Sequence, residues 1–287
     1  MSSILSLLPL FTLQTLLGLL VLAAFNVRFT RTITLCLLLF AGMFVHSAFF
    51  FCAELLHLPL TVAVVYGSLV AGLIATLPLW RSAQTMMTHL RAPSQHNLQL
   101  ADLPLIAFSG YVFYMILWAS WYWPVTPFDA MAGIDLVAKQ AAQEHTIVNR
   151  VFTDPSLQGQ LSNQPFYAPF AMLMQVMMKL LGFAYNQVWV GLVSVVFAIF
   201  MWAVLRQMVH PFLAGILYLL CLLTPEMFGY TYLLQTDFVN AVFFTAGIYL
   251  FWQGADRQRV RLVHGSAVFF AAACWSRTES PLLIAMG

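Results

Sequence analysis

The chain has 287 residues, of which 62% are hydrophobic and only 8% are charged, and its formal net charge is +2. This composition excludes an ordinary water-soluble domain and predicts a polytopic membrane protein. A small net charge spread over many loops forms no basic patch, so nothing indicates nucleic-acid binding. The cysteines lie in apolar runs without metal-ligand spacing, so we expect neither a disulfide framework nor a zinc site. They are Cys36, Cys52, Cys221 and Cys274.

Long apolar runs recur along the chain. A hydrocarbon core about 30 Å thick needs about 20 apolar residues in a helix, and lipid offers the backbone no hydrogen-bond partner, so such runs must be helical. The runs are continuous rather than alternating, which excludes the strands of a membrane barrel. We expect an all-α transmembrane bundle of about nine spans, near residues 4–25, 33–56, 60–80, 103–123, 166–183, 186–205, 212–229, 236–254 and 262–287.

Three leading helices should occupy residues 1–80, followed by a polar connector at 81–102 and a core at 103–287. The first apolar run has no basic segment before it and is too long for a cleaved signal peptide, so we expect it to remain as a helix. The last run stops at Gly287 without a polar flank, so we expect the chain to be truncated there.

An acidic loop at 124–164 interrupts the core and carries four of the ten Asp and Glu residues. If the protein has chemistry, we expect it in this loop. Thr126 as an N-cap and Pro127 at the first helical position predict a helix that runs to about Thr146. Apolar residues at helical spacing indicate that it lies on the membrane surface. These are Ile134, Val137, Ala138 and Ala141, and an interfacial aromatic belt precedes them at Trp118, Trp121, Tyr122 and Trp123.

The distribution of arginine constrains the topology. If the acidic loop lies outside the cytoplasm, the four leading arginines, from Arg28 to Arg91, fall inside. Two full crossings at 166–183 and 186–205 would then place Arg206 and the basic cluster at 256–261 outside. We therefore hypothesise that residues 166–205 cross an odd number of times, with one run re-entrant or broken, which places Asp237 on the same side as the loop.

The carboxylates of the loop differ in their expected roles. Asp129 has two open interpretations, a charge that complements the helix dipole or a chemical group. Asp135 follows six residues later, about 240° around a helix and ~9 Å along it, so the two should not form an acid and base pair. Asp135 on an amphipathic surface helix is more typical of a solvated residue. Lys139, Glu144 and Arg150 are likewise expected to form a solvated face.

Asp237 differs because it lies at the mouth of the apolar run 238–252, where a charge is costly unless paired or hydrated. We favour a functional role, with Arg277 as its first partner, although Arg277 and Glu279 could also pair with each other. Among the leading helices, Glu54 is expected to be interfacial. His46 is expected to be an interior histidine with its hydrogen bonds satisfied.

Three segments together resemble the GT-C superfamily of membrane glycosyltransferases, above all the lipid A aminoarabinose transferases and the protein O-mannosyltransferases. They are Asp129 with an acidic residue six positions later, Asn163-Gln164-Pro165-Phe166-Tyr167 before a helix, and Thr236-Asp237-Phe238 opening a Phe-rich helix. The resemblance covers about 103–287.

This resemblance implies an enzyme of the bacterial inner membrane that moves a sugar from a polyprenyl-phosphate carrier to a glycan, lipid or protein acceptor at the outer face. It implies that Asp129 is the catalytic or acceptor-orienting acid. Supporting or substrate-binding roles would fall to Asp135, Gln164, Tyr167, Asp237 and Arg277. The resemblance specifies no cofactor and leaves a divalent metal open. Ala130 follows Asp129 where many relatives carry Glu, which weakens a two-carboxylate or metal-assisted scheme.

Two other classes remain as alternatives. A secondary transporter would cluster its polar residues at mid-bilayer in interrupted helices, often in repeated halves, and the sequence contains no internal repeat. A non-catalytic assembly subunit would bury its polar residues in helix contacts and would not need an ordered acidic loop.

Overall fold

The computed structural model describes residues 7–91, 102–126, 128–158, 161–162, 168–183, 186–281 and 284, and this part of the chain is helical throughout without strands. Five of its helices are long and apolar enough to cross a membrane, which indicates an integral membrane protein. They are α2 (Arg31–Leu55), the continuous stretch Val62–Arg91, α5 (Leu103–Tyr122), α10 (Val188–Met208) and α13 (Thr236–Asp256). The shorter apolar helices are α1 (Leu7–Ala23), α9 (Phe170–Leu180), α11 (Pro211–Leu223) and α14 (Val260–Ser276).

The stretch Val62–Arg91 is built from α3 (Val62–Thr76), the short 3-10 helix η2 (Leu77–Leu79) and α4 (Trp80–Arg91). The first part of the expected polar connector is therefore helical. Its residues 92–101 lie outside the described residues. Small residues bring α1 and α2 together, because a Cβ on Gly18 or Gly42 would overlap the carbonyl oxygen of Leu38 or Gln14 on the facing helix.

His46 lies within this leading group of helices and is fully buried. Its Nδ1 is 2.8 Å from Gln14 Nε2, and its Nε2 is 2.9 Å from the carbonyl oxygen of Val65. Both ring nitrogens therefore have partners on neighbouring helices, which confirms the expectation of a satisfied interior histidine.

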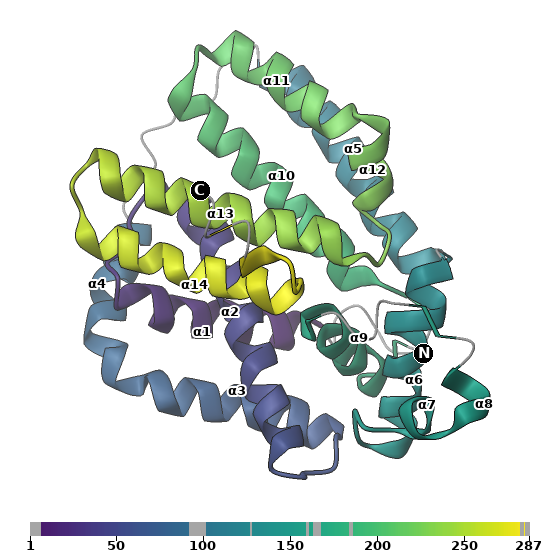
Figure 1. Cartoon of the computed structure of the whole chain (residues 1–287). Coiled ribbons are helices and arrows are strands. Elements are labelled where there is room, and N and C mark those ends of the chain that lie inside the picture. Colours follow the sequence, from purple (N-terminus) through teal and green to yellow (C-terminus); the bar gives the residue numbers. More distant parts are fainter. Residues whose placement is uncertain are drawn as a thin grey trace.

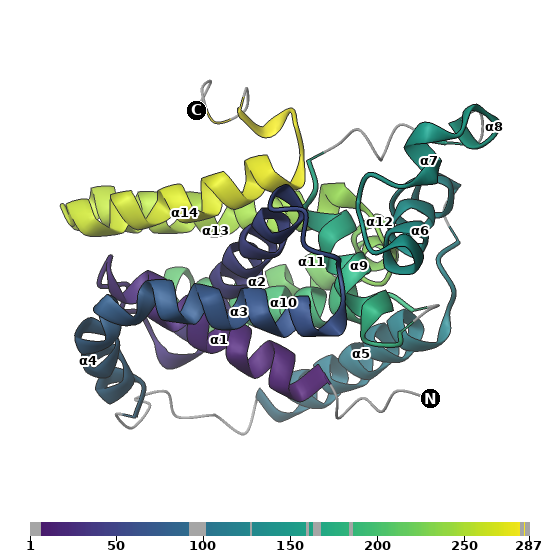
Figure 2. The same ribbon diagram turned by 90° about the horizontal axis from the view of Figure 1, so that it is seen from below.

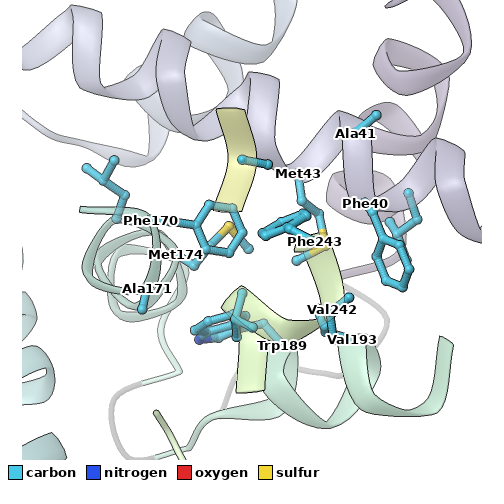
Figure 3. Packing of buried hydrophobic residues seen from close by; sticks show 14 of the residues in the cluster. Phe40, Ala41, Met43, Phe170, Ala171, Met174, Trp189, Val193, Val242 and Phe243 are labelled. Atoms are coloured by element: carbon cyan, nitrogen blue, oxygen red, sulfur yellow. The ribbon is translucent and has the colours of Figure 1, made fainter. Parts of the chain in front are cut away.

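An aromatic cluster at the centre of the molecule joins the leading helices to the core (Figure 3). Phe243 of α13 packs edge to face on Phe170 of α9 and on Phe40 of α2, with ring centroids 5.0 and 6.4 Å apart. Trp189 of α10 closes the cluster beside Phe170, at 6.0 Å. Such edge-to-face contacts match the quadrupoles of the rings, so one hydrophobic core spans both parts of the chain.

The bundle has two chemically different ends, which lie at opposite sides of Figures 1 and 2. One carries the loop helices α6 (Leu136–Glu144), α7 (Arg150–Thr153) and α8 (Pro155–Gln158), and we call it the loop end. Most carboxylates lie there, namely Glu54, Asp129, Asp135, Glu144, Asp154, Glu226, Asp237 and Glu279.

The opposite end, which we call the basic end, is defined by three contacts. Arg206 at the end of α10 pairs with Asp102 before α5 at 3.0 Å. Phe29 after α1 packs on Tyr249 of α13, and its carbonyl oxygen lies 2.8 Å from His89 Nε2 of α4. Eight of the twelve Lys and Arg residues lie at this end: Arg28, Arg31, Arg81, Arg91, Arg206, Arg257, Arg259 and Arg261.

Helix α9 does not cross between the two ends. It has 11 residues, about 16 Å of helix, and it follows the loop. After it, Phe183 packs on Trp121, and the N–H of Gln187 donates to the carbonyl oxygen of Ser120 at the end of α5. Since α10 then runs to the basic end, the described residues between 168 and 205 pass between the ends once. This is the direction that the hypothesis of an odd number of membrane crossings requires, and the number of crossings itself stays a prediction. Helix α9 is shorter than the five candidate spans.

Candidate functional site

The loop helix runs from Phe128 to Glu144 and contains a π-helical stretch, η4 (Ala130–Asp135), which continues directly into α6. Single π-helical turns are frequent at functional sites. The expected start at Pro127 lies outside the described residues. The expected apolar face is present, because Ile134, Val137, Ala138 and Ala141 are all buried. This face packs against α9 and not against lipid, so the helix is part of the bundle.

The far end of the loop helix is fixed to the α2–α3 turn. The carboxylate of Glu54 accepts hydrogen bonds from Thr146 Oγ1 at 2.6 Å and from the N–H of Ile147 at 2.8 Å. His145, which ends α6 in the left-handed conformation, forms two further bonds with the backbone of Leu60. Glu54 is therefore an anchor for the loop, a role that no sequence signal indicated, because its partners lie more than 90 residues away.

Asp129 is exposed at the start of the loop helix. Its side chain makes no capping hydrogen bond, and among the described residues none forms an ion pair with it. Its backbone oxygen accepts a hydrogen bond of 2.9 Å from Ser162 Oγ, which fixes the turn. The carboxylate is thus open to a ligand, and the capping interpretation loses its geometric support.

Asp135 is not solvated, so that expectation is wrong. Its carboxylate pairs with Lys179 Nζ at 2.7 Å and accepts a hydrogen bond of 2.9 Å from Gln175 Nε2, both from α9. The Lys179 side chain is only 5% exposed and that of Asp135 22%, so each charge depends on the other. Gln175 in turn accepts a hydrogen bond from Trp189 Nε1 at 2.9 Å. Asp135 therefore holds the loop helix against α9.

Asp237 and Arg277 form an ion pair at the loop end, which confirms Arg277 as the partner of Asp237. Arg277 Nε also donates to Glu279 at 3.0 Å, so the second expected pairing is present as well. A hydrogen bond from its own backbone, and then the bond from Arg277, hold the pKa of Glu279 below its usual range. Ser280 Oγ donates to Asn240 at 2.7 Å and fastens this segment to α13. The side chain of Asp237 is 48% exposed and that of Arg277 28%, so both are within reach of a polar ligand.

The sequence motif at 163–167 lies outside the described residues, and with it Gln164 and Tyr167. The other expected site residues divide into two groups. Asp129, Asp237 and Arg277 lie at the loop end and are accessible, whereas Asp135 is engaged in packing the loop helix.

A divalent metal does not fit this set of donors. Within the described ranges, no three His, Cys, Asp or Glu residues are grouped as metal ligands. Asp135, the next carboxylate of the loop helix after Asp129, is already paired with Lys179. No protein-family model, curated protein or solved structure matches this chain.

Proposed function

We propose that this protein is an integral-membrane glycosyltransferase that takes a sugar from a polyprenyl-phosphate carrier and passes it to a glycan, lipid or protein acceptor at the loop end. One observation carries the proposal. The exposed carboxylate of Asp129 and the paired cation Arg277 lie at the same end of an apolar bundle.

The chemistry of such a transfer needs few groups. A sugar phosphate is already activated, so the protein must accept a proton from one hydroxyl and neutralise the leaving phosphate. Asp129 is the base in this scheme, because its carboxylate is exposed and forms no ion pair with another described residue. Arg277 receives the phosphate, since a guanidinium has five donors and can bind a phosphate oxygen while it remains paired with a carboxylate. Asp237 and Glu279 hold the guanidinium in place.

An apolar hollow beside the start of α13 supports a lipid-linked donor. It lies between α10, α11, α13 and the short helix α12 (Pro225–Tyr230) and has a volume of about 30 Å³, so a carrier chain would lie along its surface and not inside it. Phe238, which directly follows Asp237, is part of its wall, together with Phe197 and Tyr218. A carrier chain along this hollow would bring its phosphate to the mouth of α13.

The charge distribution supports an extracytoplasmic site. Eight of the twelve Lys and Arg residues lie at the basic end, which is the arrangement that the positive-inside rule predicts if that end is cytoplasmic. On this basis the loop helix lies at the outer face of a bacterial inner membrane, with its aromatic neighbours at the interface.

The position of the ion pairs favours a transferase over a transporter. A transporter is expected to keep its charged groups near the bilayer midplane. Here the ion pairs of the described residues lie at the two ends, Asp102 with Arg206 at one and the pairs of Asp135 and Asp237 at the other.

The decisive variant is Asp129→Asn, measured with the full chain and a lipid-linked sugar donor. General base catalysis contributes ~10²–10⁴-fold, so we expect the transfer rate to fall by at least about 100-fold. The matched control is Asp154→Asn, another loop carboxylate, whose hydrogen bonds to Ser156 an asparagine can still accept. Its rate should be unchanged. Near-normal turnover by Asp129→Asn would rule out the assigned role.

A further inference from the structure

A path of hydrogen bonds, joined by short backbone steps, links the two halves of the proposed site. It starts at the loop helix, where Asp135 accepts a bond from Gln175 Nε2 at 2.9 Å. The same nitrogen lies 3.2 Å from the carbonyl oxygen of Asn186 in the turn between α9 and α10. The next residue, Gln187, accepts a bond of 2.9 Å from the N–H of Leu234. Leu234 stands two residues before Thr236, the first residue of α13.

Gln175 and Gln187 each connect several elements in this path of hydrogen bonds, and both side chains are fully buried. Gln175 contacts three elements, the loop helix through Asp135, the α9–α10 turn through Asn186, and α10 through Trp189. Gln187 contacts the end of α5 through its N–H and the segment before α13 through its side chain. Both amide atoms of Gln175 are paired, whereas in Gln187 only the oxygen is paired and Nε2 is buried without a hydrogen-bond partner among the described residues. The paired amide atoms specify one arrangement of their neighbours, because any other leaves further polar groups unpaired.

Leu234 is close along the chain to the ion pair of Asp237 and Arg277. Gln235 has extended backbone, with φ −139° and ψ 146°, so the two residues from Leu234 to Thr236 span at most about 7 Å. Asp237 follows immediately and is paired with Arg277. The path of hydrogen bonds therefore reaches from the helix that carries Asp129 to the helix that carries Asp237.

We infer that Gln175 and Gln187 are positioning residues that couple the loop helix to the start of α13, so that the two halves of the proposed site keep one mutual geometry. The inference rests on the proposed function for its meaning in catalysis. The coupling itself is a property of the structure and can be measured without substrate.

The test uses two buried reporter cysteines, Ala138→Cys on the face of α6 that packs on α9 and Thr236→Cys at the start of α13. Both positions are at most 1% exposed, so a thiol reagent should label them slowly. Labelling is followed by mass spectrometry of each peptide in the full-length protein, which separates these sites from the native cysteines. Local opening governs the rate, as in hydrogen exchange.

Gln175→Leu removes the hydrogen bonds that the Gln175 side chain forms with Asp135, Asn186 and Trp189. Loss of a buried hydrogen bond changes an opening equilibrium by about fivefold, and we expect at least that acceleration at Ala138→Cys and also at the distant Thr236→Cys. Gln187→Leu should accelerate both sites as well. The matched control is Gln207→Leu at the basic end, whose partners are Thr30 and Tyr249. It should leave both rates unchanged.

Acceleration only at the reporter nearest to each substitution would overturn the coupling. A variant that fails to fold is recognised because the buried native Cys36 is then labelled as fast as the two reporters. Gln175→Glu then serves in its place, since a glutamate keeps the acceptor for Trp189 but cannot donate to Asp135. It should accelerate both reporters.

An activity measurement separates this inference from the proposed function. If the protein transfers a sugar, Gln175→Leu and Gln187→Leu should lower kcat with little change in KM, because the groups that bind substrate remain present while their mutual geometry is lost. If the unmodified protein has no transferase activity, the proposed function is rejected. If both glutamine variants still accelerate the labelling of both reporters, the coupling is retained.

Discussion

At the scale of single residues, the loop end separates charges that hold the structure from charges that remain accessible. Asp135 and Lys179 are nearly enclosed and fix the loop helix, whereas Asp129 is exposed and uncommitted among the described residues. Asp237 and Arg277 are intermediate, since they pair with each other and are still partly exposed. Accessible charges at a helix mouth are the groups that a polar substrate can reach.

The pairing of Asp237 with Arg277 leads to a prediction about non-additivity. Asp237→Ala should reduce transfer more than Asp237→Asn, because asparagine can still accept a hydrogen bond from the guanidinium. Arg277→Ala should add little once Asp237 is gone, with a coupling of about 1–3 kcal/mol in a double-mutant cycle of transfer rates. Strictly additive losses would show that the two residues act separately.

At the scale of elements, close helix crossings depend on glycine. The α1–α2 crossing brings Gly42 against the backbone of Gln14, where a Cβ has no room. In contrast, nothing lies within 4 Å of a Cβ at Gly110 in α5. The same substitution should therefore have opposite effects at the two positions.

Gly42→Ala should destabilise the protein by about 1–3 kcal/mol, the usual cost of an overpacked helix contact. Gly110→Ala should be neutral or stabilising by up to ~1 kcal/mol, because alanine favours a helix interior over glycine. Both are measured as unfolding free energies in mixed detergent micelles. A stabilisation of equal size in both variants would mean that helix propensity and not packing governs these positions.

At the scale of the whole molecule, the polarity between the basic end and the loop end sets the expected orientation. We predict that cysteines at Gln143 in the loop helix and at Thr278 beside Arg277 both react with an impermeant thiol reagent in intact cells. A cysteine at Gln84 in α4, another exposed position but at the basic end, should react only after the membrane is permeabilised.

The converse pattern, with only Gln84→Cys labelled in intact cells, would invert the orientation. Labelling of Gln143→Cys without Thr278→Cys would place the acidic loop and the α13–α14 pair on different sides. That result would contradict the hypothesis of an odd number of crossings in 166–205 as well.

The sequence alone determined the helical class and the amphipathic loop helix, and it indicated that Asp237 needs a cation, with Arg277 as the first candidate. The length of an apolar run and the cost of an unpaired charge at a helix mouth are local properties of the sequence. They do not depend on which helices pack against the segment. The charge pattern also led to the hypothesis of an odd number of crossings in 166–205, although it could not say which run is re-entrant or broken.

Only the tertiary structure decided which polar residues serve the fold. The partner of Asp135 lies on α9 and that of Glu54 lies in the loop, and neither contact leaves a signal in the local sequence. The same holds for Gln175 and Gln187, whose single amides look like ordinary polar positions until their partners from four segments are placed around them. Burial and long-range pairing arise from packing the whole chain, because each depends on residues that are distant in sequence and adjacent only in the folded bundle.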